Sequence, residues 1–164
     1  MIIEYGINMT PFGSALIAKS EKGITDLQFT DNSILAEAKL LSRWQNTHLI
    51  RKDKAFVELN NKIFFEHKSY PEIELDLIGT EFQVKVWEAL LTIPLGKLST
   101  YGDIAEKVSN NNALRAVGSA VGKNPVQYLV PCHRIIKRDG TIGEYAAGVK
   151  LKKAILAFEK TRGK

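Results

Sequence analysis

The segment Val130-Pro131-Cys132-His133-Arg134-Ile135 decides how the rest of this 164-residue chain is interpreted, because it holds the single cysteine. The apolar run Tyr128-Leu129-Val130 precedes that cysteine, and an imidazole and a guanidinium follow it. The thiolate is the nucleophilic form of cysteine, and a neighbouring base or cation can depress the pKa of the thiol. We therefore expect Cys132 to be a nucleophile with a depressed pKa. A small buried hydrophobic residue is the alternative and the commoner role of a free cysteine.

The same segment resembles the active-site signature of the O6-alkylguanine-DNA alkyltransferases, repair proteins that move an alkyl group from a guanine oxygen to their own cysteine. From Gly79 to about Lys160 the chain carries further motifs in that family's order and spacing. They are Gly79-Thr80-Glu81-Phe82-Gln83, Val86-Trp87, Ile93-Pro94, Gly96, Thr100-Tyr101-Gly102-Asp103-Ile104-Ala105, Arg115-Ala116-Val117-Gly118, Asn124-Pro125 and Gly143-Glu144-Tyr145. The first half of the chain matches mainly in its layout, with Thr10-Pro11-Phe12-Gly13 as its most recognisable turn.

Length and composition indicate an intracellular protein with one or two small cores. A chain of 164 residues can bury one good core or two small ones. No apolar stretch approaches the ~20 residues of a membrane span, and the N-terminus lacks the basic region and apolar core of a secretory signal. Because a reactive thiol persists best in a reducing compartment, we expect the protein in the cytoplasm, or in the nucleus if its source is eukaryotic. We also expect a monomer that does not bind membranes.

Positive charge is concentrated in the second half of the chain. Residues 1–78 hold 9 Lys and Arg against 11 Asp and Glu, whereas residues 79–164 hold 14 against 7. An excess of that size suits a phosphate backbone, whose binding is largely electrostatic. A basic surface can also serve solubility alone, so the charge by itself leaves both interpretations open.

We expect an α+β fold with an N-terminal α/β domain and linker over residues 1–76 and a C-terminal DNA-binding and alkyl-transfer domain over residues 77–164. Alternating polarity around a turn-forming tetrapeptide predicts a hairpin in the first domain. The predicted segments are a hairpin over residues 2–8 and 14–20, a third strand over 24–29, a helix over 33–45, a segment of uncertain type over 54–66 and a linker over 66–76. The family resemblance implies a ribonuclease-H-like topology for this small strand-and-helix domain.

The C-terminal domain is predicted to be helical and to contain a helix-turn-helix, winged or plain. Three of its helices are predicted over residues 80–93, 100–108 and 113–121. Thr80 with Gln83 makes a capping box for the first helix, and Thr100 with Asp103 starts the second. The polar residues 109–112 end the second helix. Two short helices joined by such a loop are typical of a helix-turn-helix.

The outward face of the third predicted helix carries one long cation beside a nearly bare backbone. At ~100° per residue from Ala113, that face holds Arg115, Gly118 and Ser119. A glycine costs a helix interior ~1 kcal/mol, and a bare face lets another backbone approach closely. DNA is a partner that would offset this cost, and an ordinary solvent-facing surface is the alternative.

Alkyl transfer from O6 of guanine is an in-line displacement at carbon, and it requires a thiolate. At its unperturbed pKa of ~8.5 a thiol is only a few per cent ionised at neutral pH, so a base must take the proton from Cys132. His133 can do so directly or through one water. A histidine in that role requires a carboxylate to fix its tautomer and stabilise the imidazolium.

Glu159 is the carboxylate predicted for that role. In the last helix it falls at the border of an apolar stripe rather than on the outward face with three lysines. The stripe consists of Leu151, Ala154, Ile155 and Phe158, and the lysines are Lys150, Lys153 and Lys160. From geometry alone, a solvated edge residue or a partner for a nearby lysine is the commoner role for a glutamate at such a border. The resemblance favours catalysis, because Ala157-Phe158-Glu159 matches the glutamate of the family's cysteine, water, histidine and glutamate arrangement.

The resemblance assigns further roles one residue at a time. Tyr101 matches the tyrosine whose phenol protonates guanine N3, and Arg115 matches the arginine that replaces the flipped nucleotide in the base stack. Asn124 matches the hinge asparagine that ties the recognition helix to the active-site segment. The local alternatives are an aromatic side chain packed at a helix start for Tyr101 and an ordinary Asn-Pro turn for Asn124. The residues expected to contact DNA are Thr100, Arg115, Ala116, Gly118, Ser119 and Lys123.

The segment Gly143-Glu144-Tyr145-Ala146-Ala147-Gly148 resembles the family's guanine-binding loop, whose amides bind the guanine oxygen and whose tyrosine packs against the base. Most members have Asn at the position of Glu144, Ser at Ala146 and often Gly at Ala147. The missing hydroxyl is expected to weaken the hydrogen bond to O6, and the extra methyl at Ala147 to narrow the pocket. The expected pocket residues are Val130, Pro131, Tyr145, Ala146 and Ala147.

The predicted partner is double-stranded DNA that contains O6-alkylguanine or O4-alkylthymine. An alkylated base inside a duplex cannot reach a buried thiol, so the nucleotide must be flipped out at a cost of a few kcal/mol. The resemblance implies that the recognition helix enters the minor groove, where sequence information is degenerate. The predicted function is direct-reversal DNA repair by a suicidal cysteine S-methyltransferase that transfers the alkyl group irreversibly to Cys132.

Two rival functions stay open on the sequence. A non-catalytic alkyltransferase-like protein would keep the fold and bind lesions, although such relatives carry tryptophan in place of the cysteine. A cysteine hydrolase would use Cys132, His133 and Glu159, yet thiol proteases take their histidine from a distant part of the chain. No cofactor is expected, and no zinc site, because the one cysteine is far in sequence from His48 and His67.

Overall fold

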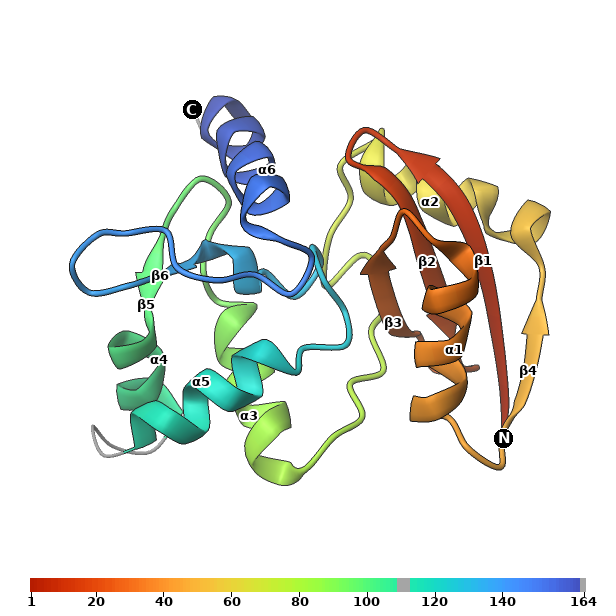
Figure 1. The fold of residues 1–164 in the computed structure, drawn as a ribbon, viewed down its shortest axis with the longest axis horizontal. Helices are drawn as coiled ribbons and strands as arrows, with labels where there is room; N and C mark the ends of the chain where they lie inside the picture. Colours follow the sequence, from red (N-terminus) through yellow and green to blue (C-terminus); the bar gives the residue numbers. More distant parts are fainter. Residues whose placement is uncertain (109–112, 163–164) are drawn as a thin grey trace. The chain divides into compact units, whose positions relative to one another are not determined.

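The computed structural model describes residues 1–108 and 113–162, and the chain divides into two compact units, Met1–Leu77 and Ile78–Lys164 (Figure 1). Each unit has its own buried apolar core. Within the described ranges, no helix has the length and apolar character needed to cross a membrane. The polar residues 109–112, predicted to end a helix, lie outside the described residues.

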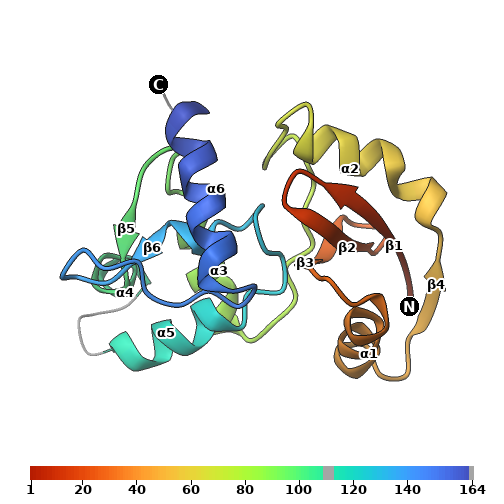
Figure 2. The ribbon, with the colours of Figure 1, turned by 45° about the horizontal axis from the view of Figure 1, so that its top comes forward.

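The N-terminal unit is a four-stranded mixed sheet with a helix on each face (Figure 2). In chain order its elements are β1 (Ile2–Thr10), β2 (Gly13–Lys19), β3 (Ile24–Phe29), α1 (Ser33–Arg43), β4 (His48–Arg51), the 3-10 helix η1 (Asp53–Phe56) and α2 (Val57–Phe64). The strand order is β3-β2-β1-β4, in which β1, β2 and β3 are antiparallel neighbours and β4 runs parallel to β1. The ribonuclease-H-like topology of this unit stays a prediction.

The predicted hairpin is confirmed, and its turn follows from the side chains there. The Thr10 hydroxyl donates to the Gly13 carbonyl at 2.7 Å and accepts from the Phe12 amide at 2.9 Å. Gly13 has a φ of 99°, a conformation that a residue with a Cβ rarely adopts. The turn therefore fixes the register of β1 against β2.

Alternation along β3 places the two helices on opposite faces of the sheet. Asp26 accepts hydrogen bonds from Arg43 and Trp44 at the end of α1, both at 2.8 Å. Phe29, three residues later and so on the other face, packs edge-on against Phe64 of α2 with ring centroids 5.9 Å apart. The sheet is therefore covered on both sides.

Two details of the N-terminal unit differ from the sequence predictions. Strand β4 was not predicted, because four residues with mixed exposure give almost no periodic signal. The end of the predicted linker over residues 66–76 also pairs with the start of β3, which was not predicted. The Ile24 amide donates to the Glu74 carbonyl, and the Asp76 amide donates back to the Ile24 carbonyl. The polar segment with a proline was read only as a linker, although the main chain of its last residues extends the edge of the sheet.

The C-terminal unit is mainly helical, as predicted. In chain order its elements are α3 (Glu81–Leu90), β5 (Ser99–Thr100), α4 (Tyr101–Val108), α5 (Leu114–Gly122), the 3-10 helix η3 (Cys132–Arg134), β6 (Ile135–Ile136) and α6 (Val149–Arg162). The parallel pair β5 and β6 was not predicted, because two-residue strands carry no periodicity. It joins the residues before α4 to those directly after η3.

Helix α3 packs against both helices of the helix-turn-helix, α4 and α5. The predicted capping box between Thr80 and Gln83 is present. The buried Trp87 indole donates to the carbonyl of Ala120 in α5 at 2.9 Å. A Cβ on Gly79 would lie 2.6 Å from the Trp87 ring, so only glycine fits there. Helix α5 is thus held by a hydrogen bond from the buried Trp87 indole as well as by apolar packing.

Helix α6 buries a different face from the predicted stripe. Its buried residues are Lys152, Ile155 and Glu159, whereas Ala154 is exposed. An apolar stripe was expected because charged residues are rarely buried without partners. Here both charged side chains have partners inside the unit, so the helix is rotated relative to the predicted arrangement.

Candidate active site and nucleic-acid interface

Cys132 begins the 3-10 helix η3 and is buried, with 6% of its surface exposed. The side-chain amide of Asn124, which follows α5, donates to Sγ of Cys132 at 3.2 Å and to the Val130 carbonyl at 2.8 Å. The Oδ1 of Asn124 accepts from the Val126 amide at 2.9 Å. One asparagine therefore joins the end of α5 to the Val130 carbonyl and to Cys132.

Burial raises the pKa of the Cys132 thiol, whereas the sequence predicted a depressed one. The hydrogen bond from Asn124 and the positive charge of Lys152 oppose the rise without cancelling it. The predicted cation, Arg134, is directed at Glu159 instead of the thiol. The prediction failed because the cost of burying a thiolate exceeds the help from neighbouring groups. The resting group is a thiol, so the reaction needs a base.

His133 and Glu159 lie in contact, although 26 residues separate them in sequence. The Nε2 of His133 and Oε2 of Glu159 are 2.9 Å apart, and both side chains are almost fully buried. Burial lowers the pKa of His133, against the opposing effect of Glu159. The imidazole is therefore neutral at pH 7, the state in which it can accept a proton.

Arg134 is the second partner of the Glu159 carboxylate. Its Nε and Nη2 donate to Oε1 and Oε2 of Glu159, both at 2.9 Å, and its Nη1 donates to the Ile93 carbonyl at 2.6 Å. Burial opposes ionisation of Glu159, but the hydrogen bonds and charges of His133 and Arg134 outweigh burial and lower the pKa of Glu159 to about 2. The carboxylate is thus ionised at every pH at which the protein works.

Two tyrosines flank the imidazole of His133. Tyr128 stacks on one side, with ring centroids 6.1 Å apart, and Tyr145 meets it edge-on at 6.2 Å. Among the described residues, the buried Nδ1 of His133 and the buried hydroxyl of Tyr145 have no hydrogen-bond partner. The sequence named Tyr145 for the base pocket but missed Tyr128, whose place beside the imidazole has no signature in the local pattern.

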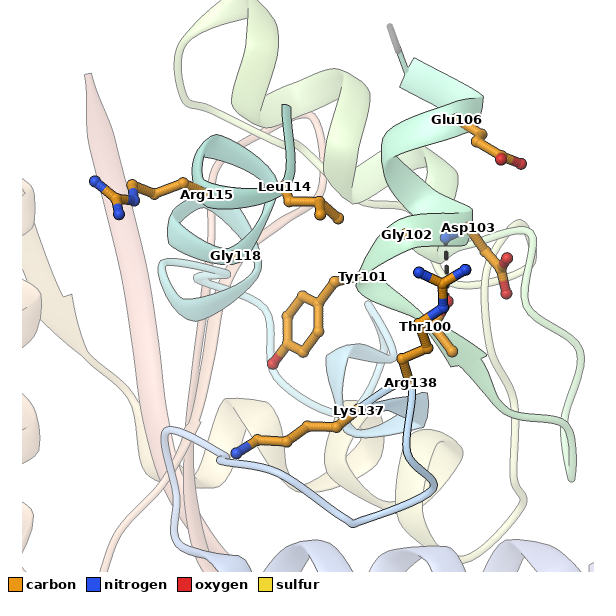
Figure 3. A pocket seen from close by; sticks show the side chains of 10 residues that line it. All are labelled: Thr100, Tyr101, Gly102, Asp103, Glu106, Leu114, Arg115, Gly118, Lys137 and Arg138. Atoms are coloured by element: carbon orange, nitrogen blue, oxygen red, sulfur yellow. Dashed lines mark hydrogen bonds between the residues drawn. The ribbon is translucent and has the colours of Figure 1, made fainter. Parts of the chain in front are cut away.

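A cavity of about 660 Å³ lies between the helix-turn-helix and the turn after β6 (Figure 3). Its lining residues are Thr100, Tyr101, Gly102, Asp103, Glu106, Leu114, Arg115, Gly118, Lys137 and Arg138. Thr100 accepts from the Asp103 amide at 3.1 Å and so caps α4 as predicted. Burial, and then the charges of Cys132 and Glu144, raise the pKa of Tyr101. Its phenol therefore keeps its proton and can donate it.

Five of the predicted DNA-contact residues lie on α5 or just beyond its end, and the sixth, Thr100, lies in β5 directly before α4. Arg115, Ala116 and Ser119 are exposed, as is Lys123 after the helix. A Cβ built on Gly118 would meet nothing within 4 Å, so packing inside the chain does not require glycine there. Figure 3 shows Arg115 extending away from the Tyr101 phenol. The helix thus presents a long cation and a bare backbone outward.

Lys137 and Arg138 are two cavity cations that the sequence analysis missed. They follow β6 directly, and both are exposed. Figure 3 places them across the cavity from Leu114 and Arg115. A lysine and an arginine directly before Asp139-Gly140 indicate a charged turn. Because β6 was not predicted, nothing in the sequence placed that turn near α5.

The predicted pocket residues do not line this cavity. Val130 and Pro131 are buried directly before Cys132, Ala146 is exposed, and Ala147 is partly exposed. The structure therefore separates an outer cavity, formed by the helix-turn-helix, from the inner group of Cys132, His133 and Tyr145.

Comparisons with known proteins agree with this arrangement. Residues 81–161 match the family model described as 6-O-methylguanine DNA methyltransferase, DNA binding domain. A protein of Mycobacterium tuberculosis named methylated-DNA--protein-cysteine methyltransferase is 36% identical over 98% of this chain and 94% of its own length. A protein of the same name from Methanosarcina mazei is 37% identical, over 94% of this chain and 96% of its own.

A solved structure extends the likeness to the whole fold. The crystal structure of Mycobacterium tuberculosis OGT in complex with DNA matches with a TM-score of 0.79 and 34% identity, over 97% of this chain and 94% of that one. The match therefore covers both units as well as the motif region. With His133 and Glu159 hydrogen-bonded to each other beside Cys132 in the chain, and with relatives similar over nearly their full length, the chain belongs to the methylated-DNA–protein-cysteine methyltransferase family.

Proposed function

We propose that this protein repairs alkylated DNA by transferring the alkyl group from O6 of guanine to Sγ of Cys132, in a single irreversible reaction. The hydrogen bond between His133 and Glu159 carries the proposal, since it places an oriented neutral base next to the cysteine in the chain. A buried thiol that keeps its proton at rest has use for such a base. A rival protein that only binds lesions has no need of the arrangement.

In the proposed reaction His133 takes the proton of the Cys132 thiol, directly or through one water. The proton goes to Nδ1, which has no hydrogen-bond partner among the described residues. Glu159 then stabilises the imidazolium, because its carboxylate stays ionised down to about pH 2. The thiolate attacks the alkyl carbon in line with the bond to O6. A sulfur–carbon bond forms, the carbon–oxygen bond breaks, and the electron pair leaves with guanine.

Tyr101 is the proposed acid for the leaving guanine. Its phenol lies at the start of α4 in the wall of the cavity, and burial keeps it protonated. Donation to N3 neutralises the departing base, and the proton that His133 took from the thiol replaces the one that Tyr101 gives. The overall change is a thiol and an alkylguanine converted to a thioether and guanine.

The exposed face of α5 is the proposed surface for the minor groove of double-stranded DNA. Its bare backbone at Gly118 allows close approach, and Arg115 is long enough to replace a flipped nucleotide in the base stack. The basic C-terminal unit, with Lys137 and Arg138 across the cavity, suits phosphates. We further propose that the protein acts as a monomer in the cytoplasm, or in the nucleus of a eukaryote.

The intact mass of the protein after incubation with an oligonucleotide containing O6-methylguanine tests the function. We expect one methyl group per chain, located on Cys132 by peptide mapping, and no further turnover when substrate is in excess, because a thioether offers no labile bond. Binding without any mass increase would favour the non-catalytic lesion-binding function. Multiple turnovers would favour a hydrolase.

Replacing Arg115 with alanine is expected to slow repair of duplex DNA about tenfold to a hundredfold, because its proposed role offsets part of a flipping cost of a few kcal/mol. The reaction with free O6-benzylguanine should change little, since a free base needs no flipping. Stopped reactions followed by intact mass give both rates. Lys160→Ala, which removes an exposed cation from α6, is the matched control. Equal losses on the two substrates would contradict the proposed role.

A further inference from the structure

Helix α6 buries a lysine that the proposed chemistry does not use. Lys152 has none of its surface exposed. Its Nζ donates to the carbonyls of Ile135, Ile142 and Glu144 at 2.6, 2.6 and 3.1 Å. Three carbonyl acceptors match the three hydrogens of an ammonium group, whereas a neutral amine has two. A buried charge without a carboxylate partner is costly, so this lysine stabilises something that the fold requires.

The three carbonyls belong to two segments that meet at the active site. Ile135, in β6, ends the nucleophile segment, residues 132–135. Ile142 and Glu144 stand on either side of Gly143, at the start of the guanine-binding loop. Gly143 has a φ of 72°, and a Cβ there would lie 3.9 Å from Nζ of Lys152. The ammonium therefore links the nucleophile segment to the start of the guanine-binding loop.

Lys152 and Glu159 act on the nucleophile segment from the same face of one helix. They are seven residues apart, close to two helical turns, and Ile155 is buried between them. Glu159 binds the side chains of His133 and Arg134, and Lys152 binds the main chain of the next residue. Helix α6 thus holds the catalytic turn at one point and the loop at the other.

We propose that Lys152 is the positioning residue that sets the guanine-binding loop, residues 143–148, relative to Sγ of Cys132. This inference rests on the proposed function, because it assigns the loop to the alkylated base. The residue after Glu144 is Tyr145, whose ring packs edge-on against His133, so a shift at the lysine carries directly to the wall of the base site. The ammonium also lies near enough to Cys132 to oppose the rise in the thiol pKa.

The test compares two reagents for the same sulfur. Iodoacetamide needs only an ionised, accessible thiol, whereas free O6-benzylguanine also needs the loop in place. We expect Lys152→Met to lower the rate with O6-benzylguanine at least about tenfold more than the rate with iodoacetamide, because misplacement by about 1 Å can cost a hundredfold. Lys153→Met, the same change at the exposed neighbouring residue, should alter neither rate. Hydrogen exchange of amides 143–148 should rise in Lys152→Met while that of α3 stays unchanged.

Equal losses with both reagents, or unchanged exchange in the loop, would overturn the positioning role. If Lys152→Met does not fold, Lys152→Arg carries the same comparison. A planar guanidinium keeps the charge but cannot direct three hydrogens at these three carbonyls, so an unchanged ratio of rates in that variant would also overturn the inference. A wild-type protein that reacts with iodoacetamide but with no alkylguanine, free or in DNA, would instead contradict the proposed function.

Discussion

Replacing Cys132 with serine is expected to abolish alkyl transfer to the protein and to leave its affinity for DNA unchanged. A hydroxyl ionises far less readily than a thiol, so His133 cannot generate a nucleophile from it. The substitution preserves the turn, because a serine Oγ can accept the hydrogen bond that Asn124 now donates to Sγ. Intact mass measures the transfer, and fluorescence anisotropy with a methylated duplex measures the affinity.

The unchanged DNA affinity expected of Cys132→Ser distinguishes a role in alkyl transfer from a role in DNA binding. Cys132 is 6% exposed and does not line the cavity beside the helix-turn-helix, so the serine variant should bind DNA like the wild type. Cys132→Ala provides a second variant without any hydroxyl. Alkylation that persists in either protein would place the acceptor on another residue, and a large loss of affinity in both would assign Cys132 to DNA binding.

Replacing Glu159 with glutamine is expected to slow alkyl transfer about a hundredfold or more, the contribution typical of an oriented base. A neutral amide can still contact His133 but cannot stabilise its protonated form. Because burial raises the pKa of Cys132, raising the pH should restore part of the lost rate only above the ordinary thiol pKa of ~8.5. Glu88→Gln, an exposed position on α3, is the control. An unchanged rate and pH profile in folded Glu159→Gln protein would remove Glu159 from the mechanism.

The same substitution is expected to lower the free energy of unfolding by about 3 kcal/mol, because removing one partner leaves the mostly buried Arg134 uncompensated. The wild type should show the matching acid response. The pKa of Glu159 is about 2 in the folded state against an ordinary 4.5, so its stabilisation is complete above pH 4.5 and is lost as the pH falls toward 2.

His133 adds to this acid response in the same direction. Its pKa is lowered on folding from 6.5, so its contribution is present above pH 6.5 and declines as the pH falls below that value. Denaturant unfolding of the wild type and of Glu159→Gln, measured from pH 7 to pH 3, separates the two groups. The variant should retain the loss that begins below pH 6.5 and should lack most of the loss below pH 4.5. Parallel curves for the two proteins would contradict the assignment.

Much of the helical unit could be predicted because its signals are local. The capping box of Thr80 and Gln83, the outward face of α5 and the cap at Thr100 are set by residues three or four apart. The hairpin turn at Gly13 is equally local. By contrast, β4, β5 and β6 are too short for a period, and the main chain of residues 74–76 pairs with a strand 50 residues away.

The sequence by itself determined that Cys132 has a neighbouring imidazole, that the basic charge lies in the second half, and that one helix face is bare at Gly118. Only the tertiary structure decided what the charged residues of the last helix do. Sequence periodicity ranks residues by polarity, so it placed an apolar stripe at the core and left Lys152 without a role. In the fold, Glu159 meets His133 and Arg134, and Lys152 meets three carbonyls. Because hydrogen bonds to distant partners offset the cost of burying these charges, the helix buries these two charged side chains, and no local pattern reports that.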